Sequence, residues 1–121
     1  TVAVMSRSAE KFVNLPPGVQ GVVGDLQQPQ TLPAAMSGVD AVFLATALAP
    51  DEINQGLEAV EAVKDAGVRR IVYMSVQGAD QAVHIPHFAT KIPIEYAVRH
   101  SGLEWNILRP NNFFQNDFWV R

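Results

Sequence analysis

His87, Lys91 and Glu95 follow one another at intervals of four residues, in the segment HFATKIPIE. In a helix this spacing places the three side chains on nearly one face. Histidine exchanges a proton near neutral pH, and lysine carries a positive charge there, so the pair is suited to acid–base chemistry. The alternative is an ordinary amphipathic surface helix that carries solvated charges.

Pro93 interrupts this segment, because a proline inside a helix loses a hydrogen bond and clashes with the carbonyl four residues earlier. Two interpretations are open. The regular helix begins near Ile92, which puts Pro93 in a tolerated first turn and leaves residues 87–91 as a looser entry turn. Otherwise a single helix is kinked at the proline. In either case the stretch is more typical of the lip of a site than of a plain surface helix.

The composition indicates one globular domain. The chain has 121 residues, of which 48% are hydrophobic and 17% charged. Its net charge of −3 excludes the basic field of a nucleic-acid-binding protein, and no apolar run approaches the length of a membrane span. The absence of cysteine excludes a disulfide framework and a zinc–thiolate site, and nothing motivates another metal site.

Both ends of the chain predict that it is part of a longer protein. It opens on the apolar run TVAVM without an initiator methionine, and it closes on the aromatic-rich FFQNDFWVR. We therefore expect further sequence on either side of these residues.

Short apolar runs alternate with helical patterns along the whole chain. Strands are predicted at residues 1–5, 19–23, 40–45, 70–74 and 104–109. Helices are predicted at residues 8–14, 30–37, 51–66 and 87–101. This alternation favours an α/β fold in which right-handed βαβ units form a parallel sheet.

The helix at 51–66 carries the clearest signals. Asp51 is placed to cap its beginning, and Gly67 stands where a left-handed residue ends a helix. Its predicted buried stripe consists of Ile53, Leu57, Val60 and Val63. At the first helix, Ser8 is the predicted N-cap.

Open parallel sheets bind ligands beyond the carboxyl ends of their strands, and this rule selects the segments that follow each predicted strand. They are Ser6–Arg7–Ser8, Gly24–Asp25–Leu26, Ala45–Thr46–Ala47, Ser75–Val76 and Pro110–Asn111–Asn112–Phe113. Small and polar residues are also what ordinary loops contain, so each segment alone is weak evidence for a site.

Together these segments resemble the NmrA-like branch of the atypical short-chain dehydrogenases. The motifs that carry the resemblance are GDL after a strand, VYMS at the end of another, HFATK…E on a helix, and SGLEWNILRPNNFFQN at residues 101–116. The resemblance implies a three-layer Rossmann domain, residues 1–121, that binds a nicotinamide dinucleotide. It also implies that the family's first strand, Gly-rich loop and first helix precede Thr1, and that its substrate-binding part follows Arg121.

Arg7 indicates which dinucleotide is preferred. It follows the strand whose end meets the adenosine ribose in this fold, where a carboxylate would accept from the 2′-hydroxyl of NAD. The segment MSRS offers an arginine and no acid, which favours the 2′-phosphate of NADP. The alternative is a solvated surface arginine.

Further cofactor contacts follow from the resemblance. Asp25 is expected to accept from the adenine amino group with Leu26 against the ring, although Asp25 is equally suited to capping a helix. The loop with Thr46 is expected to pass close to a ribose, or to be only a tight loop. The remaining predicted contacts are Ala45, Ala47, Pro110, Asn112 and Phe113.

Three residues are predicted to take part in catalysis. The resemblance implies that Lys91 contacts the nicotinamide ribose, and that His87 occupies the place of the tyrosine acid of the Tyr-x-x-x-Lys motif. His87 is then a proton donor, or else a polar residue at a helix start. Ser75 is placed to polarise a substrate carbonyl, whereas Glu95 is expected to form a salt bridge.

Two functions remain open at this stage. One is a cytoplasmic NADPH-dependent reductase of a quinone or small carbonyl or enone. The other is a non-catalytic NADP(H) sensor that regulates a protein partner, which the loss of the tyrosine favours. Lys91 is compatible with both, and the residues that would shape the substrate pocket are expected beyond Arg121.

Overall fold

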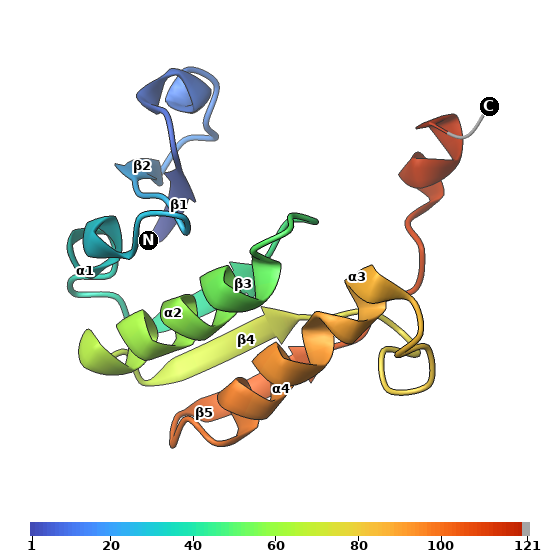
Figure 1. Ribbon diagram of the computed structural model, residues 1–121. Coiled ribbons are helices and arrows are strands. Elements are labelled where there is room, and N and C mark those ends of the chain that lie inside the picture. Colours follow the sequence, from blue (N-terminus) through green and yellow to red (C-terminus); the bar gives the residue numbers. More distant parts are fainter. Residues whose placement is uncertain (120–121) are drawn as a thin grey trace.

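The computed structural model describes residues 1–119 and contains five parallel strands in two sheets (Figure 1). The prediction of a parallel α/β fold is confirmed, and every predicted strand is present to within one residue at each end. The strands are β1 (Val2–Ser6), β2 (Val19–Val23), β3 (Ala41–Ala45), β4 (Arg70–Met74) and β5 (Glu104–Leu108).

Strand β4 is the centre of the larger sheet, with β3 on one side and β5 on the other. All pairs are parallel, and their registers align Ala45 with Met74 and Met74 with Leu108. The three strands therefore end at one level. Residues that follow them directly along the chain are brought to a common edge.

Two long helices pack on each other and on the larger sheet, namely α2 (Glu52–Asp65) and α4 (Lys91–Arg99) (Figure 1). The shorter elements are α1 (Leu32–Ala35), α3 (Pro86–Ala89) and 3₁₀ helices at Ala9–Phe12, Pro29–Thr31 and Phe114–Trp119. The predicted helix at 8–14 is thus a single 3₁₀ turn. Its predicted N-cap is confirmed, because the Ser8 hydroxyl accepts a hydrogen bond from the Glu10 N–H.

The predicted helix at 87–101 is divided into α3 and α4 at Thr90. Pro93 lies in the first turn of α4, where the backbone N–H that proline lacks would have no partner inside the helix. The structure therefore has a short helix, α3, before the regular helix, which begins at Lys91 and not at Ile92, while Thr90 between them keeps helical angles (φ −64°, ψ −25°).

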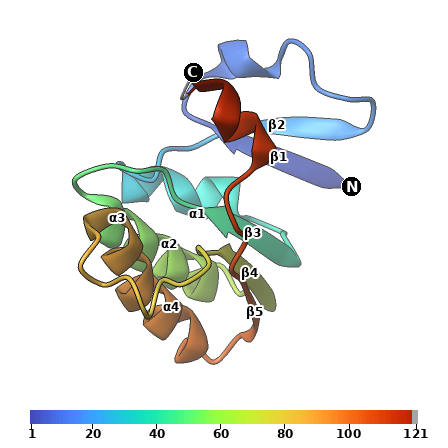
Figure 2. The same cartoon turned by 90° about the vertical axis from the view of Figure 1, so that its right-hand side faces the viewer.

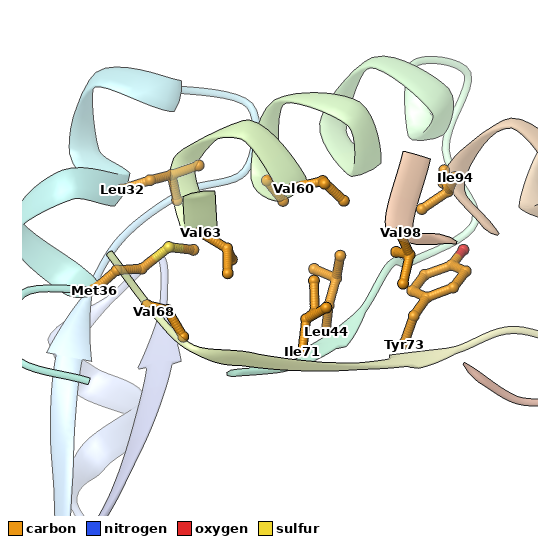
Figure 3. Packing of buried hydrophobic residues seen from close by; sticks show 11 residues of the cluster. Leu32, Met36, Leu44, Val60, Val63, Val68, Ile71, Tyr73, Ile94 and Val98 are labelled. Atoms are coloured by element: carbon orange, nitrogen blue, oxygen red, sulfur yellow. The ribbon is translucent and has the colours of Figure 1, made fainter. Parts of the chain in front are cut away.

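The main core lies between these helices and the sheet (Figure 3). Ile71 and Tyr73 of β4 face Val60 and Val63 of α2 and Val98 of α4, all of them almost fully buried. Burying one such aliphatic side chain contributes about 1.5–3 kcal/mol. The complete buried cluster is Leu32, Met36, Leu44, Ala59, Val60, Val63, Val68, Ile71, Tyr73, Ile94 and Val98.

Gly56 lets α2 and α4 approach closely. A Cβ atom at this position would lie 2.4 Å from Cδ1 of Ile94, a separation that carbon atoms do not adopt without displacement. The spacing of the two helices therefore depends on the missing side chain of residue 56.

The ends of α2 only partly follow the prediction. Gly67 has φ of 72° and ends the helix as expected, with its N–H donating to the Lys64 carbonyl at 3.0 Å. Asp51 stands at the N-cap position, but its carboxylate accepts from the Gln55 side chain at 2.8 Å instead of from the backbone.

The buried face of α2 is also rotated from the predicted stripe. Val60 and Val63 are buried as expected, whereas Ile53 and Leu57 are only half-buried. The helix buries instead a set that includes polar residues: Glu52, Gln55, Gly56, Ala59, Val60 and Val63. This rotation brings the Glu52 carboxylate into the interior, where its partners are residues of the candidate site.

Strands β1 and β2 form a separate sheet, which Figure 2 shows apart from β3, β4 and β5. In the described chain β1 and β3 each pair on one side only. On these one-sided strands, Val2 and Val4 of β1 are 61% and 41% exposed. In β3, Leu44 faces the core and Val42 is half-buried. Within residues 1–119 no helix is long and apolar enough to cross a membrane.

Residues 1–121 produced alone are expected to self-associate or to fold only partly, because β1 and β3 each have one unpaired edge. An unpaired buried amide costs about 1–3 kcal/mol, a large share of a total stability of about 5–15 kcal/mol. Sedimentation velocity over a range of concentrations should show self-association, and hydrogen exchange should show weak protection in β3. The double variant Val4→Lys/Phe43→Lys should associate less, because edge charges oppose strand pairing. A monomer with a cooperative transition and strongly protected β3 amides would contradict this expectation.

Candidate functional site

The candidate site lies at the carboxyl ends of β3, β4 and β5. A pocket of about 490 Å³ opens there between α3, the start of α4 and the segments that follow β4 and β5. The pocket brings together six residues that the sequence predicted: Ser75, His87, Lys91, Pro110, Asn112 and Phe113. The remaining lining residues were not singled out as contacts, and they are Met74, Val76, Gln77, Phe88, Asn111 and Asn116.

Lys91 extends from the first position of α4 toward the end of β3. Its Nζ donates to Oε1 of Glu52 in an ion pair, to the hydroxyl of Thr46 at 3.2 Å and to the Thr46 carbonyl at 3.4 Å. The Lys91 side chain is 13% exposed and that of Glu52 is fully buried. The ammonium group is therefore held at the boundary between the core and the pocket.

Glu52 belongs to the candidate site through its contact with Lys91, although the sequence did not single it out. It occupies the first turn of α2, where the helix dipole favours a negative charge. Oε1 accepts from the Thr46 hydroxyl at 2.7 Å and Oε2 accepts from the Thr90 hydroxyl at 2.9 Å, in addition to the Lys91 contact. Each carboxylate oxygen is thus hydrogen-bonded, which compensates the loss of water around a buried charge.

Tyr73 completes this cluster from β4. Its hydroxyl lies 3.4 Å from that of Thr46, and because Thr46 gives its single proton to Glu52, Tyr73 is the donor in this contact. Burial is the main cause that raises the pKa of Tyr73 to about 12, and the nearby carboxylates of Glu52 and Glu95 add to it while the Thr46 hydrogen bond opposes it. The phenol is therefore neutral at physiological pH and acts as a fixed donor.

A second buried carboxylate, Glu95, ties α4 to the end of β5. Arg109 donates from Nε and Nη2 to the two Glu95 oxygens at 2.9 Å and 2.7 Å, and Arg99 approaches Oε2 at 3.2 Å. Arg109 also pairs with Asp80 at 3.1 Å. The expectation that Glu95 forms a salt bridge is confirmed. Burial by itself would raise the pKa of Glu95, but the hydrogen bonds and charge of Arg109 lower it below its ordinary value.

Ser75 lines the pocket, but its hydroxyl oxygen is buried. The residue is only 5% exposed, and among residues 1–119 Oγ makes no hydrogen bond of ordinary geometry, although the nearby hydroxyl contributes to the lowered pKa of Glu95. An unsatisfied buried hydroxyl costs about 1–3 kcal/mol, so the Ser75 hydroxyl gains from a partner. Its predicted role at a substrate carbonyl stays a prediction.

His87 lies on α3 at the rim of the same pocket. Its ring meets Phe88 edge-on with the centroids 4.5 Å apart, and the residue is exposed. Within the described part of the chain no hydrogen bond engages the ring. The imidazole is therefore accessible to a molecule in the pocket, and its role as proton donor stays a prediction.

Thr46 differs most from its expected environment. The residue is 9% exposed, and its hydroxyl turns inward to Glu52, Lys91 and Tyr73. A ribose contact from this loop would therefore come from the backbone and not from the Thr46 hydroxyl. The flanking Ala45 and Ala47 are exposed, and their predicted contacts stay predictions.

The other predicted contacts belong to the smaller sheet and lie outside the pocket. Arg7 is exposed directly after β1. Asp25 follows β2, and its carboxylate accepts from the Gln27 N–H at 2.9 Å, so it closes a turn and does not cap a helix. Leu26 is half-buried against the main core.

A second hollow, of about 480 Å³ and thus similar in size to the pocket at the strand ends, lies between Pro33 and α2 and contains no predicted site residue.

Comparison with known proteins gives a consistent result. Residues 1–118 match a family described as NAD(P)H-binding. The NAD(P)H azoreductase of Xenophilus azovorans is 40% identical over 101 residues, which are 82% of this chain and 35% of the relative. The photosystem II assembly factor Ycf39 of Guillardia theta is 30% identical over 81% of this chain and 34% of its own. The chain spans about a third of the length of these curated relatives.

A solved structure agrees with this assignment. The triphenylmethane reductase of Citrobacter sp., complexed with NADP(H), superimposes with a TM-score of 0.87 at 30% identity. The match covers 98% of this chain and 42% of the reductase. The predicted resemblance to NmrA-like Rossmann domains and the prediction of a nicotinamide dinucleotide are thereby confirmed.

Replacement of Glu95 by glutamine in the full-length protein is expected to reduce the free energy of unfolding by about 1–3 kcal/mol near neutral pH, because Arg109 loses its charged partner. The lowered pKa of Glu95 stabilises the fold above its ordinary value of 4.5, and this contribution disappears as the pH falls through the lower folded value. Urea unfolding should therefore show a difference between wild type and Glu95→Gln that shrinks in acid.

The matched control is Glu61→Gln, which breaks an exposed pair with Lys64. It should change stability much less, since exposed ion pairs contribute little. A difference for Glu95→Gln that stays constant from neutral to acid pH would contradict the role of its charge.

Proposed function

Since the chain belongs to the NAD(P)H-binding family, we propose that it forms the cofactor-binding part of an NADPH-dependent reductase. The proposed acceptor is a quinone or a small carbonyl or enone. The observation that carries this proposal is the single pocket that gathers Ser75, His87 and Lys91 at the carboxyl ends of the strands. The similarity to an azoreductase and to a triphenylmethane reductase supports reduction of a conjugated organic acceptor.

The residues of the pocket fit a nicotinamide cofactor. Lys91 offers N–H groups to ribose hydroxyls, and Ser75, which also lines the pocket, is the proposed donor to an oxygen of the acceptor. The backbone around Pro110, with Asn112 and Phe113, lines the opposite wall. When bound, the cofactor supplies a hydride, and the chain's own contribution is to orient both reactants and to provide a proton.

His87 is the proposed proton donor. Reduction of a carbonyl or quinone by hydride leaves an oxygen that must take up a proton, and a histidine at the pocket rim transfers one near neutral pH. Its ring is free of other hydrogen bonds among residues 1–119, so no competing partner has to be displaced.

The preference for NADPH over NADH rests on Arg7. Its exposed guanidinium at the end of β1 suits a bidentate contact to a 2′-phosphate, and a carboxylate suited to the 2′-hydroxyl of NADH is absent from the MSRS segment. The neighbouring structure of a reductase complexed with NADP(H) supports the same choice.

The second candidate is an NADP(H) sensor that acts on a protein partner. A relative named as a photosystem II assembly factor favours it, because an assembly factor works on other proteins. Here Lys91 would still contact the cofactor, but His87 would have no chemical role. The cytoplasmic location expected from the sequence belongs to the reductase proposal, since a photosystem partner would place the protein elsewhere.

Replacement of Arg7 by alanine in the full-length protein is expected to weaken NADPH binding by about 10- to 100-fold and to leave NADH binding unchanged. A charge-assisted contact to phosphate is worth about 1.5–3 kcal/mol. Fluorescence titration gives the dissociation constants of both cofactors. Lys11→Ala removes the same charge from an exposed position nearby and should have little effect. Equal binding of both cofactors by wild type, or equal weakening of both by Arg7→Ala, would sink the proposal.

Lys91→Ala and His87→Phe separate the two candidate functions. Lys91→Ala should weaken NADPH binding in either case. For a reductase, His87→Phe should lower kcat by about 10²- to 10⁴-fold with unchanged NADPH binding, because it removes a general acid. The assay is NADPH oxidation with a panel of quinones and enones, with His84→Phe as a matched exposed control. Tight NADPH binding by wild type without turnover of any acceptor would favour the sensor, and negligible effects of both variants would reject this pocket.

A further inference from the structure

Glu52 is a buried carboxylate whose bonding is complete without any ligand. It is 1% exposed, and its partners come from three separate elements: Thr46 after β3, Thr90 between α3 and α4, and Lys91 on α4. A charge is buried in a protein only where such partners compensate it. The cluster therefore fixes the positions of Thr46, Thr90 and Lys91, or that of the Glu52 side chain, which they surround.

The only member of the cluster that also lines the pocket is Lys91. Lysine has a long flexible stem that favours water for its ammonium group, so an isolated Lys91 at the rim would sample many rotamers. Glu52 and Thr46 instead hold Nζ beside the carboxyl end of β3, where the side chain keeps 13% of its surface exposed.

We propose that Glu52 is a positioning residue that holds the Lys91 ammonium group at the cofactor pocket. The inference rests on the proposed contact between Lys91 and the cofactor. The Glu52 oxygen and the Thr46 hydroxyl take two of the three ammonium hydrogens, and the third makes only a 3.4 Å contact to the Thr46 carbonyl. A ribose hydroxyl replaces that long contact and leaves the other two in place.

The charge of Glu52 has a second effect, on which ligand groups the pocket accepts. Paired with Glu52, Lys91 adds no net charge to its side of the pocket, and Arg109 is likewise paired with Glu95 and Asp80. Lys91 thus acts toward a ligand as a directed hydrogen-bond donor more than as a free cation. This suits uncharged ribose hydroxyls better than a phosphate group.

A double-mutant cycle in the full-length protein tests the inference. The dissociation constant of NADPH is measured by fluorescence for wild type, Glu52→Gln, Lys91→Met and the double variant. Glu52→Gln keeps the size of the side chain and removes its charge. We expect it to weaken NADPH binding at least tenfold in the wild-type background, and to change binding less than twofold when Lys91 is already methionine. Glu58→Gln, on the exposed face of the same helix, should have no effect in either background.

Each outcome has a definite meaning. If Glu52→Gln weakens binding equally in both backgrounds, its role is to support the fold in general and the inference is wrong. If Lys91→Met weakens binding but Glu52→Gln does not, the cofactor contact of Lys91 stands and only the positioning role of Glu52 is rejected. If Lys91→Met has no effect, the proposed contact of Lys91 fails, and the inference fails with it.

Thr90→Val keeps the test decisive if Glu52→Gln does not fold. It removes the hydrogen bond to Oε2 while retaining the charge and the side-chain volume. We expect a threefold to tenfold loss of NADPH affinity that also vanishes in the Lys91→Met background. Circular dichroism and thermal unfolding of every variant establish that the native fold is retained, and a loss of affinity that persists beside Lys91→Met would overturn the inference.

Discussion

The parallel pairing of β4 with both of its neighbours determines where everything else in the site lies. Because Ala45, Met74 and Leu108 are in register, the chain leaves the sheet at one level three times. Thr46, Ser75 and Arg109 therefore follow at a common edge although they are far apart in sequence. A shift of one strand by a single residue would turn its inward side chains to the opposite face and remove one of the three from this row.

Two ion pairs of opposite polarity hold helix α4 to this edge of the sheet. Helix α4 supplies the cation in one pair and the anion in the other. Lys91 pairs with Glu52 of α2, and Glu95, one turn later, pairs with Arg109 after β5. Lys91 and Glu95 have the spacing of a helical ion pair, but Lys91 pairs with another element, and Glu95 pairs with Arg109 as well as with Arg99 of its own helix. The four-residue interval that suggested one chemical face thus serves two tertiary contacts, and only His87 and Lys91 of the original three line the pocket.

Much of the fold can be predicted from the sequence, because the spacing of apolar residues and the position of a residue relative to a strand carry the information. Buried parallel strands appear as apolar runs, and the rule for the carboxyl ends of strands predicts Ser75 and Asn112 near one ligand, whereas Lys91 is implied by the family resemblance. Glu52 could not be identified in this way. An acidic residue in the first turn of a helix normally faces water, and its burial depends on Thr46, Thr90 and Lys91.

The dependence of burial on tertiary partners also explains the smaller differences between the predicted and the observed helix α2. Ile53 is more apolar than Glu52, so hydrophobic periodicity places the stripe of α2 on the wrong residues. The stripe is rotated because the ionic contact with Lys91 contributes to the choice of face. Asp51 was a reasonable cap by residue type, but its carboxylate bonds to the Gln55 side chain, and such side-chain competition has no signature along the chain.

The contact between Gly56 and Ile94 links the evolution of two positions that lie outside the pocket. A methyl group at residue 56 would displace either the Ile94 side chain or α4 itself, and with α4 the Lys91 partner of Glu52. A smaller residue at position 94, such as alanine, would make room for a side chain at position 56. Among homologues that keep the Glu52–Lys91 pair, these two positions should therefore vary jointly, with their combined volume nearly constant.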